Sequence, residues 1–240
     1  MTAPESFDVR LERARMLSPT VRELVFARVD GRPVDFAPGQ WFNLMLPHEG
    51  GELKRAYSIA SAPAGTASFE VAVTRVIGGP ASEQLHAMEI GTSVRAVGPS
   101  GLFTREPADP TPALFVGTGT GVTPLRSMMA AALSAGSKAP MWLLFGVRHQ
   151  NDVLYQDELT RWEAEHDNVR VFITLSRPDH GWLGRAGYVQ THLPALWSEL
   201  GQEGAHLYVC GLERMVKAVR EVARKGLGID RKHVHQERYD

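Results

Sequence analysis

Apolar positions follow two different patterns in the two halves of this 240-residue chain. Between residues 7 and about 103 the apolar runs are short or alternate with polar residues, and turn-forming pairs such as Asp30-Gly31 and Pro38-Gly39 separate them. Short strands at this spacing are typical of an antiparallel barrel or sandwich. The predicted strands cover residues 21–26, 41–46, 69–74 and 93–97. A predicted helix at residues 80–88 begins with proline, which the first helical turn tolerates.

The second half alternates continuous apolar runs with helical stretches. Continuous apolar strands are buried on both faces, and together with connecting helices they indicate a parallel α/β sheet. Predicted strands cover residues 113–117, 141–147, 169–175 and 206–210, and predicted helices cover 124–134, 154–165, 189–196 and 213–225. Prolines crowd residues 106–112, so this segment is predicted to be an extended linker. We therefore predict an N-terminal antiparallel β-barrel at residues 1–105 and a C-terminal α/β parallel-sheet domain at residues 112–240.

Charge and cysteine content narrow the possible functions. A formal net charge of −1 gives no global reason to expect nucleic acid or an anionic membrane as partner. The single cysteine, Cys210, excludes an internal disulfide and a four-thiolate iron–sulfur cluster. The polar start, Met1-Thr2-Ala3, has no apolar signal region, and no stretch approaches the roughly 18 apolar residues that span a bilayer. We expect a cytoplasmic protein without membrane insertion.

Alternating glycines mark the turn between a predicted strand and a predicted helix in the second half, Gly117-Thr118-Gly119-Thr120-Gly121-Val122-Thr123-Pro124. Glycines let the backbone approach a phosphate, and the free N–H groups of a helix start favour an anion. Such a turn can also serve packing alone, but its place at the carboxyl end of a strand favours a nucleotide. The usual dinucleotide fingerprint has a carboxylate on the next strand tip. Here that strand ends Gly146-Val147-Arg148, so ribose and adenine must be held elsewhere.

The barrel half carries Arg55-Ala56-Tyr57-Ser58, which alone is an ordinary alternating strand. A second glycine-rich helix start, Gly78-Gly79-Pro80-Ala81-Ser82, follows it. An arginine fork binds phosphate bidentately, a tyrosine ring lies along an aromatic ligand, and a serine hydroxyl donates to a ring nitrogen. The two segments together favour binding over a purely structural strand.

The order of these segments resembles the ferredoxin–NADP reductase superfamily along nearly the whole chain. Each matching segment is weakly specific alone, whereas their joint order and spacing are highly specific. The segments are Phe36-Ala37-Pro38-Gly39-Gln40, Arg55-Ala56-Tyr57-Ser58, Gly78-Gly79 with Ser82, Gly98-Pro99-Ser100-Gly101, residues 117–124, Phe145-Gly146-Val147-Arg148, Cys210-Gly211 and Glu237-Arg238-Tyr239. The resemblance implies a flavin-binding antiparallel barrel followed by a nicotinamide-dinucleotide-binding α/β domain, without an iron–sulfur domain.

On the flavin side, the resemblance implies that Arg55 binds the flavin phosphates, Tyr57 packs on the flavin and Ser58 hydrogen-bonds near its N5 atom. Gly78, Gly79 and Ser82 would cradle the pyrophosphate at a helix start. This helix start suits the pyrophosphate of FAD, so FAD is favoured over FMN.

On the nicotinamide side, the resemblance places Gly119, Thr120 and Gly121 against the cofactor's phosphates, with Thr123 and Pro124 shaping the turn. Cys210 and Glu237 would lie where nicotinamide meets flavin, so Ser58, Cys210 and Glu237 are the predicted catalytic residues. A lone cysteine at a strand end is also often just a small hydrophobe. Tyr239 would cover the flavin face, although a terminal aromatic is often inert and Asp240 follows it here.

The preference between NADP(H) and NAD(H) depends on the adenosine end. In NADP-dependent members a Ser-Arg pair and a Tyr-x-Gln segment surround the 2′-phosphate and adenine. The corresponding residues are Ser176, Arg177, Arg185, Tyr188 and Gln190. Arginines there and the lack of an acidic residue favour NADPH, but NADH-using relatives can carry similar runs.

The implied function is hydride transfer from NAD(P)H to FAD, followed by electron transfer to a separate carrier such as ferredoxin or flavodoxin. Three alternatives stay open: a free-flavin or ferric reductase, an NADH-dependent reductase component of an oxygenase, and a nucleotide-binding subunit without turnover of its own. His233-x-His235 lacks a third ligand of suitable spacing, so no metal site is predicted. The basic positions of the helix at 213–225 form a solvated face or a docking surface for an acidic carrier.

Overall fold

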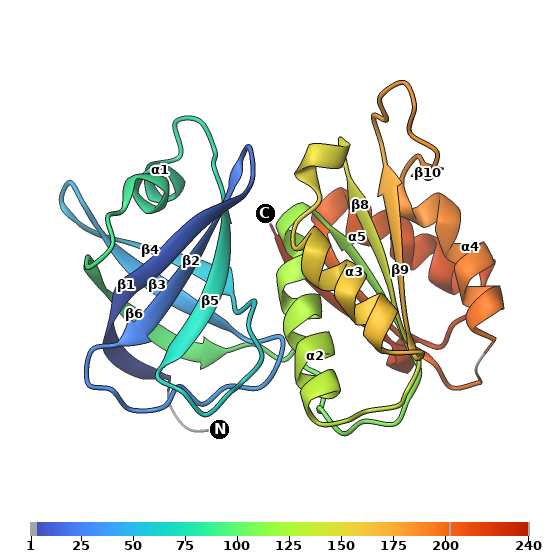
Figure 1. Ribbon diagram of the computed structural model, residues 1–240, viewed down its shortest axis with the longest axis horizontal. Helices are drawn as coiled ribbons and strands as arrows, with labels where there is room; N and C mark the ends of the chain where they lie inside the picture. The colour runs from blue at the N-terminus through green and yellow to red at the C-terminus, as the bar shows by residue number, and fades with distance from the viewer. Residues whose placement is uncertain (1–3, 202, 240) are drawn as a thin grey trace.

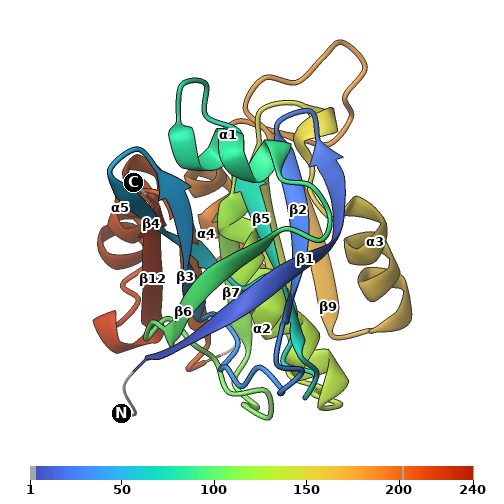
Figure 2. The same ribbon diagram turned by 90° about the vertical axis from the view of Figure 1, so that its left-hand side faces the viewer.

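The computed structural model describes residues 4–201 and 203–239. Its barrel half is one six-stranded antiparallel sheet. Strand order is β4-β3-β6-β1-β2-β5, and an isolated bridge between Ile59 and Val71 links the two ends of the sheet. Figures 1 and 2 show the sheet curled into a barrel with α1 (Pro80–Ala87) across one end. The strands are β1 (Glu5–Ser18), β2 (Val21–Arg28), β3 (Trp41–His48), β4 (Gly51–Ser58), β5 (Ser68–Thr74) and β6 (Ser93–Ser100). The predicted barrel is confirmed; Met1–Ala3 lie outside the described residues.

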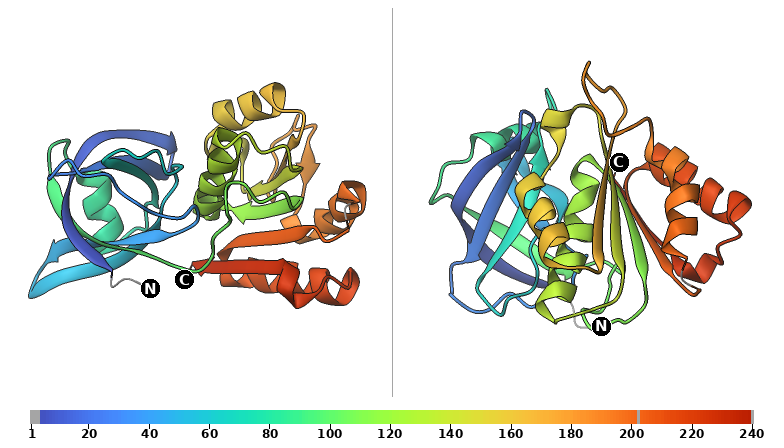
Figure 3. Two further views of the ribbon diagram at one scale, coloured as in Figure 1. Left: turned by 90° about the horizontal axis from the view of Figure 1, so that it is seen from below. Right: turned by 45° about the vertical axis from the view of Figure 1, so that its right-hand side comes forward.

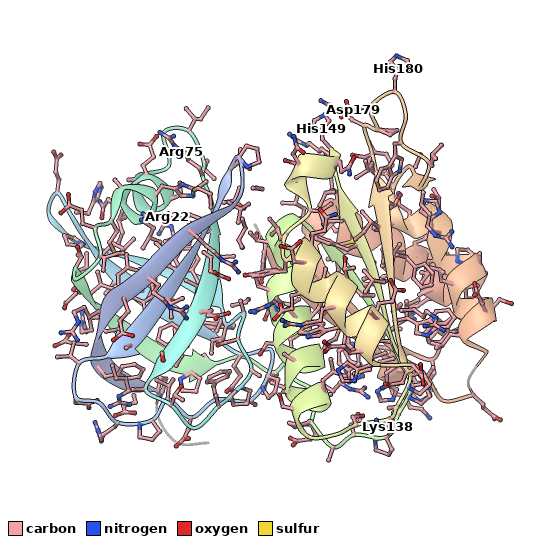
Figure 4. The ribbon with its side chains drawn as sticks, in the orientation of Figure 1. Arg22, Arg75, Lys138, His149, Asp179 and His180 are labelled. Atoms are coloured by element: carbon pink, nitrogen blue, oxygen red, sulfur yellow. The ribbon has the colours of Figure 1, made fainter. Side chains whose placement is uncertain are left out.

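Aromatic rings fill the barrel because alternate strand positions point inward. The Phe42 and Phe69 ring centroids lie 4.7 Å apart, and Phe26 stacks on Phe69 at 6.0 Å. Arg22 fixes α1 to the barrel: its guanidinium donates to the carbonyls of Leu85, His86 and Met88 at the end of that helix. Figure 4 shows Arg22 beneath α1, with Arg75 on the same end of the barrel.

The segment between the halves is turned rather than extended, which corrects the sequence prediction. The Asp109 amide donates to the Glu106 carbonyl at 3.1 Å, and the Thr111 amide donates to the Asp109 carboxylate at 2.8 Å. Buried Arg105 explains the difference, because its guanidinium gathers the carbonyls of Asp109 and Thr111. A buried cation needs such acceptors, and a turned segment supplies them.

The second half is a six-stranded parallel sheet in the order β10-β9-β8-β7-β11-β12. This confirms the predicted parallel α/β sheet, of which four strands had been predicted. Helices α2 and α3 cover one face and α4 and α5 the other, which Figure 3 shows from below. The strands are β7 (Ala113–Thr118), β8 (Met141–Val147), β9 (Val169–Leu175), β10 (Arg185–Ala186), β11 (His206–Leu212) and β12 (Val234–Tyr239). The helices are α2 (Val122–Ser134), α3 (Gln156–Glu165), α4 (Val189–Leu200) and α5 (Glu213–Glu221).

Short helical turns join these elements. Three are 3-10 turns: Gly119–Gly121, Gln150–Asp152 and Arg231–His233. The predicted helix at 213–225 is shorter than expected, since α5 ends at Glu221 and a π-helical turn, Val222–Gly226, follows. No helix in the described ranges is long and apolar enough to cross a membrane.

One hydrophobic cluster joins the two halves. Val21, Ala60 and Phe103 of the barrel pack with Leu125 and Met128 of α2. Gly39 of the barrel permits the close approach to α2, because a Cβ there would lie 2.5 Å from the terminal methyl carbon of Met128. In Figure 1, α2 is the helix nearest the barrel, and the chain ends between the two halves. The C-terminal strand therefore reaches the seam where both halves contribute side chains.

Candidate functional site

Strand register brings three predicted catalytic or cofactor residues to the seam. Cys210 on β11 lies opposite Glu237 on β12 and opposite Gly117 on β7. Ser58 is the last residue of β4 in the barrel. Because the carboxyl ends of parallel strands share one edge, Glu237 and Cys210 face the end of β4 across the seam.

A chain of hydroxyl hydrogen bonds crosses the seam. The Ser58 hydroxyl donates to Glu237 Oε1 at 3.1 Å, and the Tyr239 hydroxyl donates to Ser58 Oγ at 2.5 Å. Tyr239 also lies 3.3 Å from Thr123 Oγ1, which donates to the Thr120 carbonyl at 2.8 Å. The barrel strand, the glycine turn and the C-terminal strand thus meet in one polar network. Asp240, which follows Tyr239, lies outside the described residues.

Burial shapes the acid–base properties of this network. Burial raises the pKa of Glu237 to about 7, and the Ser58 hydrogen bond opposes that rise. Burial, followed by the nearby charge of Glu237, raises the pKa of the Cys210 thiol well above its ordinary value. Burial also raises the pKa of Tyr239. Glu237 is therefore the group in this network that exchanges a proton near neutral pH, whereas Cys210 stays a neutral thiol.

The glycine turn is fitted against the end of β11. A Cβ on Gly121 would lie 2.3 Å from the Cys210 carbonyl oxygen, so only glycine fits there. Gly119 adopts φ +53° with open space around it. Thr118 Oγ1, at the end of β7, is buried without a hydrogen-bond partner among the described residues. Gly121 therefore serves packing against β11, and the open space at Gly119 fits a phosphate-bearing ligand at this helix start.

The barrel side presents Arg55 and Tyr57 on β4. Arg55 is exposed, and its guanidinium donates a hydrogen bond of 2.9 Å to the carbonyl of the adjacent Lys54. Tyr57 packs half-buried against the barrel core, and burial raises its pKa to about 12 while Arg55 opposes the rise. An accessible cation beside a fixed ring fits a phosphate and an aromatic ring system.

The second glycine turn, at residues 78–79, binds a carboxylate oxygen through a backbone amide. Gly78 adopts φ +74° in open space, and its amide donates to the Glu83 carboxylate at 3.1 Å. Ser82 lies beneath the turn instead of projecting from it: its hydroxyl accepts from the Val76 amide at 3.0 Å and contacts the Gly79 carbonyl at 3.0 Å. The turn, with Arg55 and Tyr57, fits the pyrophosphate and ring of FAD.

The residues predicted for the adenosine end lie apart from this network. Ser176 and Arg177 follow β9, and β9 and β10 lie at the opposite edge of the sheet from β12. Arg177 and Tyr188 are exposed. Figure 4 shows Asp179 and His180 on the protruding loop between β9 and β10, which also contains Ser176 and Arg177. The strand order places the glycine turn between the two groups, as an extended dinucleotide requires.

Arg185 and Gln190 contribute differently to this end. The Arg185 guanidinium lies over the Phe172 ring at 5.2 Å, so it packs along β9 rather than at the strand tip. Gln190 lies half-buried in the first turn of α4. Arg148, which the sequence reasoning did not select, lies beside the tip instead: its carbonyl accepts from the Arg177 amide at 2.9 Å. The sequence could have indicated this, since Arg148 and Arg177 each follow the end of a predicted strand of the parallel sheet.

Three histidines lie close together at the amino ends of β11 and β12 and on the turn that leads into β12. His235 Nε2 lies 3.1 Å from His206 Nδ1, and the His206 and His233 ring centroids are 5.0 Å apart. Within residues 4–201 and 203–239 no group of three His, Cys, Asp or Glu side chains is arranged to hold a metal ion.

Comparisons with known proteins agree with this geometry. Family models match an oxidoreductase FAD-binding domain over residues 8–104 and an oxidoreductase NAD-binding domain over residues 115–221. Ferredoxin–NADP reductase B of Sorangium cellulosum is 57% identical and aligns over 100% of both chains. The reductase component of the naphthalene 1,2-dioxygenase/salicylate 5-hydroxylase systems of Ralstonia is 30% identical over 98% of this chain and 73% of its own. A solved cytochrome P450 reductase from Amycolatopsis has a TM-score of 0.87 at 25% identity, covering 99% of this chain and 71% of its own.

Proposed function

This chain belongs to the ferredoxin–NADP reductase superfamily, and we propose that it oxidises NADPH and delivers electrons to a separate ferredoxin- or flavodoxin-type carrier. It is a FAD-dependent oxidoreductase that takes electrons from NAD(P)H. Residues 1–105 would hold FAD, and residues 112–240 would hold the nicotinamide cofactor. The observation that carries the proposal is the Ser58–Glu237 hydrogen bond, because it joins a barrel residue to a residue of the α/β sheet at the carboxyl edge.

Bound FAD would supply hydride acceptance and single-electron release. Arg55 and the start of α1 would bind its phosphates, and the Tyr57 ring would pack along its ring system. The Ser58 hydroxyl would donate near N5. Buried Cys210 and the Gly119–Gly121 turn would border the nicotinamide and its phosphates, which excludes water from the reacting atoms.

Glu237 would move the proton that accompanies electron release. Its carboxylate accepts from Ser58, so a proton can pass from the Ser58 side to Glu237 and then to solvent. A pKa of about 7 suits this role, because the group gains and loses its proton at physiological pH.

Arginines support the preference for NADPH. Arg177 and Arg148 lie on adjoining strand tips, and Arg177 is exposed. Arginines on two adjoining strand tips suit a 2′-phosphate better than a bare ribose, which a carboxylate would hold. Arg185 would add charge from the neighbouring edge strand.

Similarity to oxygenase reductases supports a second candidate. The 30% identical Ralstonia protein is named as a reductase component of dioxygenase and hydroxylase systems. The same site would then use NADH and supply an oxygenase. Relative identity favours the first candidate, since the Sorangium protein matches at 57% over its full length.

Anaerobic stopped-flow spectroscopy tests the proposal. The purified protein is mixed with NADPH or NADH while the visible flavin band is followed, and the reduced protein is then mixed with ferredoxin or flavodoxin. We expect retained flavin, faster bleaching with NADPH, and rapid reoxidation by one of the two carriers. Faster bleaching with NADH would favour the oxygenase candidate. Flavin that leaves during gel filtration would indicate a free-flavin reductase, and bound flavin that neither nucleotide reduces would indicate a subunit without turnover.

A further inference from the structure

We propose that Arg126 is a positioning residue for hydride transfer, because its guanidinium fixes the α/β domain against the barrel segment that follows Ser58. This inference rests on the proposed function. Arg126 lies on α2, the helix that begins directly after the glycine turn, and only 8% of it is exposed. Neither the sequence motifs nor the polar network of the site includes it.

The guanidinium bonds to both halves of the molecule at once. Toward the barrel, Nη1 donates to the Ala60 carbonyl at 2.8 Å and to the Glu70 carboxylate at 2.6 Å. Toward its own domain, Nε and Nη2 donate to the Glu158 carboxylate on α3, the latter at 3.1 Å. The Tyr155 ring centroid lies 4.3 Å from the guanidinium carbon. One planar group thus links three polar acceptors and a ring in fixed directions.

The position of this joint relates it to the reacting atoms. Ala60 lies two residues after Ser58, and its amide donates to the Glu70 carbonyl at 2.7 Å. Next to Arg126, the Ser127 hydroxyl donates to the Ser61 carbonyl at 2.6 Å. Residues 58–61 therefore connect Ser58, the expected hydrogen-bond donor to flavin N5, to α2, the helix that follows the glycine turn. A shift of α2 against residues 58–61 would move the nicotinamide relative to the flavin.

Hydride transfer is sensitive to such a shift. A displacement of about 1 Å from the reactive geometry costs on the order of 10²-fold in rate. Nucleotide affinity should be less sensitive, because the expected dinucleotide contacts lie within the α/β domain. A loosened joint should therefore lower the limiting rate of flavin reduction while leaving the Kd for NADPH nearly unchanged.

Three variants test the joint in the flavin-loaded full-length protein. Arg126→Lys keeps the positive charge but loses the planar, multidentate guanidinium. Glu70→Ala removes the carboxylate, one of the two barrel acceptors of Arg126, and leaves the Ala60 carbonyl. Arg28→Lys is the matched control: Arg28 is a buried arginine that pairs with Glu5 at 2.9 Å and Asp30 at 2.8 Å, all within the barrel. Anaerobic stopped-flow mixing with NADPH gives the limiting reduction rate and the Kd. Mixing the reduced protein with ferricyanide gives a reoxidation rate that needs no nicotinamide alignment.

We expect Arg126→Lys and Glu70→Ala to lower the limiting reduction rate roughly 10-fold or more, with Kd and ferricyanide reoxidation within about 3-fold of wild type. Arg28→Lys should leave all three unchanged. An unchanged reduction rate in both joint variants would overturn the inference, as would a parallel fall in reduction and reoxidation with loss of flavin. If Arg126→Lys does not fold, Ser127→Ala with Glu70→Ala gives the same reading. A wild-type protein that neither nucleotide reduces would instead refute the proposed function.

Discussion

The two ends of the expected dinucleotide site are built differently. At the seam, Ser58, Thr123, Glu237 and Tyr239 contact one another through hydrogen bonds, and Ser58 and Thr123 are buried. At the adenosine end, Arg177 and Tyr188 are exposed, and Arg185 packs on Phe172 instead of joining them. Side chains are hydrogen-bonded to one another where chemistry is expected, and are mostly exposed to solvent where only recognition is expected.

Backbone placement explains this contrast. Ser58, Glu237 and Tyr239 lie on strand ends whose register is fixed by neighbouring strands, as Glu237 lies opposite Cys210. The adenosine residues flank a loop between β9 and β10 that protrudes from the sheet edge (Figure 1). Orientation of reacting groups lowers the reaction barrier directly, whereas a specificity contact contributes only when its ligand is bound.

Ser58→Ala should produce the largest change, because it deletes the centre of the seam network. The substitution removes the donor to Glu237 and the acceptor of Tyr239 together. We expect the limiting rate of flavin reduction by NADPH to fall about 10²–10³-fold, as for loss of one preorganised donor at a reacting atom. Stopped-flow absorbance measures it. Ser18→Ala, at another buried barrel serine, is the control and should leave the rate unchanged.

Glu237→Gln should remove a pH dependence. Burial raises the pKa of Glu237 to about 7, so the carboxyl is protonated below that pH and ionised above it. In the direction of NADPH oxidation the ionised form accepts the departing proton. Reoxidation of the reduced protein by a one-electron acceptor should therefore rise with pH through about 7 and then level off. In Glu237→Gln the rate should be lower, on the order of 10²-fold, and flat across this range.

Stopped-flow reoxidation rates measured between pH 5.5 and 8.5, at about one-unit steps chosen to bracket that pKa, check this prediction. An inflection that survives in Glu237→Gln would assign the titration to another group. Cys210 is a poor alternative, because burial, the largest cause of its raised thiol pKa, is still present in Glu237→Gln.

The sequence was sufficient for the fold class and for the seam residues, for identifiable physical reasons. Alternating and continuous apolar runs distinguish the barrel from the parallel sheet. Ser58, Cys210 and Glu237 lie in segments whose order resembles a known superfamily, and the structure brings them together. Strand β12 was not predicted, because Val234–Tyr239 is a polar edge strand without a continuous apolar run.

Contacts between distant segments could not be predicted. Arg126 looks like a surface residue in the sequence, although it follows Leu125 and precedes Met128 in an otherwise apolar helix. Its partners Ala60, Glu70 and Glu158 are far away along the chain. Arg105 likewise turns a proline-rich segment that local preference makes extended. Buried arginines recruit acceptors from wherever the fold supplies them, so their roles follow only from the assembled structure.

Arg177→Ala should produce the smallest of these changes, confined to nucleotide recognition. Its exposed guanidinium would meet the 2′-phosphate in solvent, where an ion pair is weak. We expect the Kd for NADPH to rise by a factor of about 2 to 5, with the limiting reduction rate and the Kd for NADH little changed. Stopped-flow titrations with both nucleotides measure these values.

Arg185→Ala is the matched variant at this end, because its guanidinium already lies over Phe172 at 5.2 Å. Its effect on the Kd for NADPH should be smaller than that of Arg177→Ala. A larger effect would mean that Arg185 leaves the Phe172 ring to bind the phosphate, so that the adenosine end rearranges on binding. Equal losses for NADPH and NADH in Arg177→Ala would contradict a 2′-phosphate contact. A fall in the limiting rate would show that the open end of the site is coupled to the ordered seam.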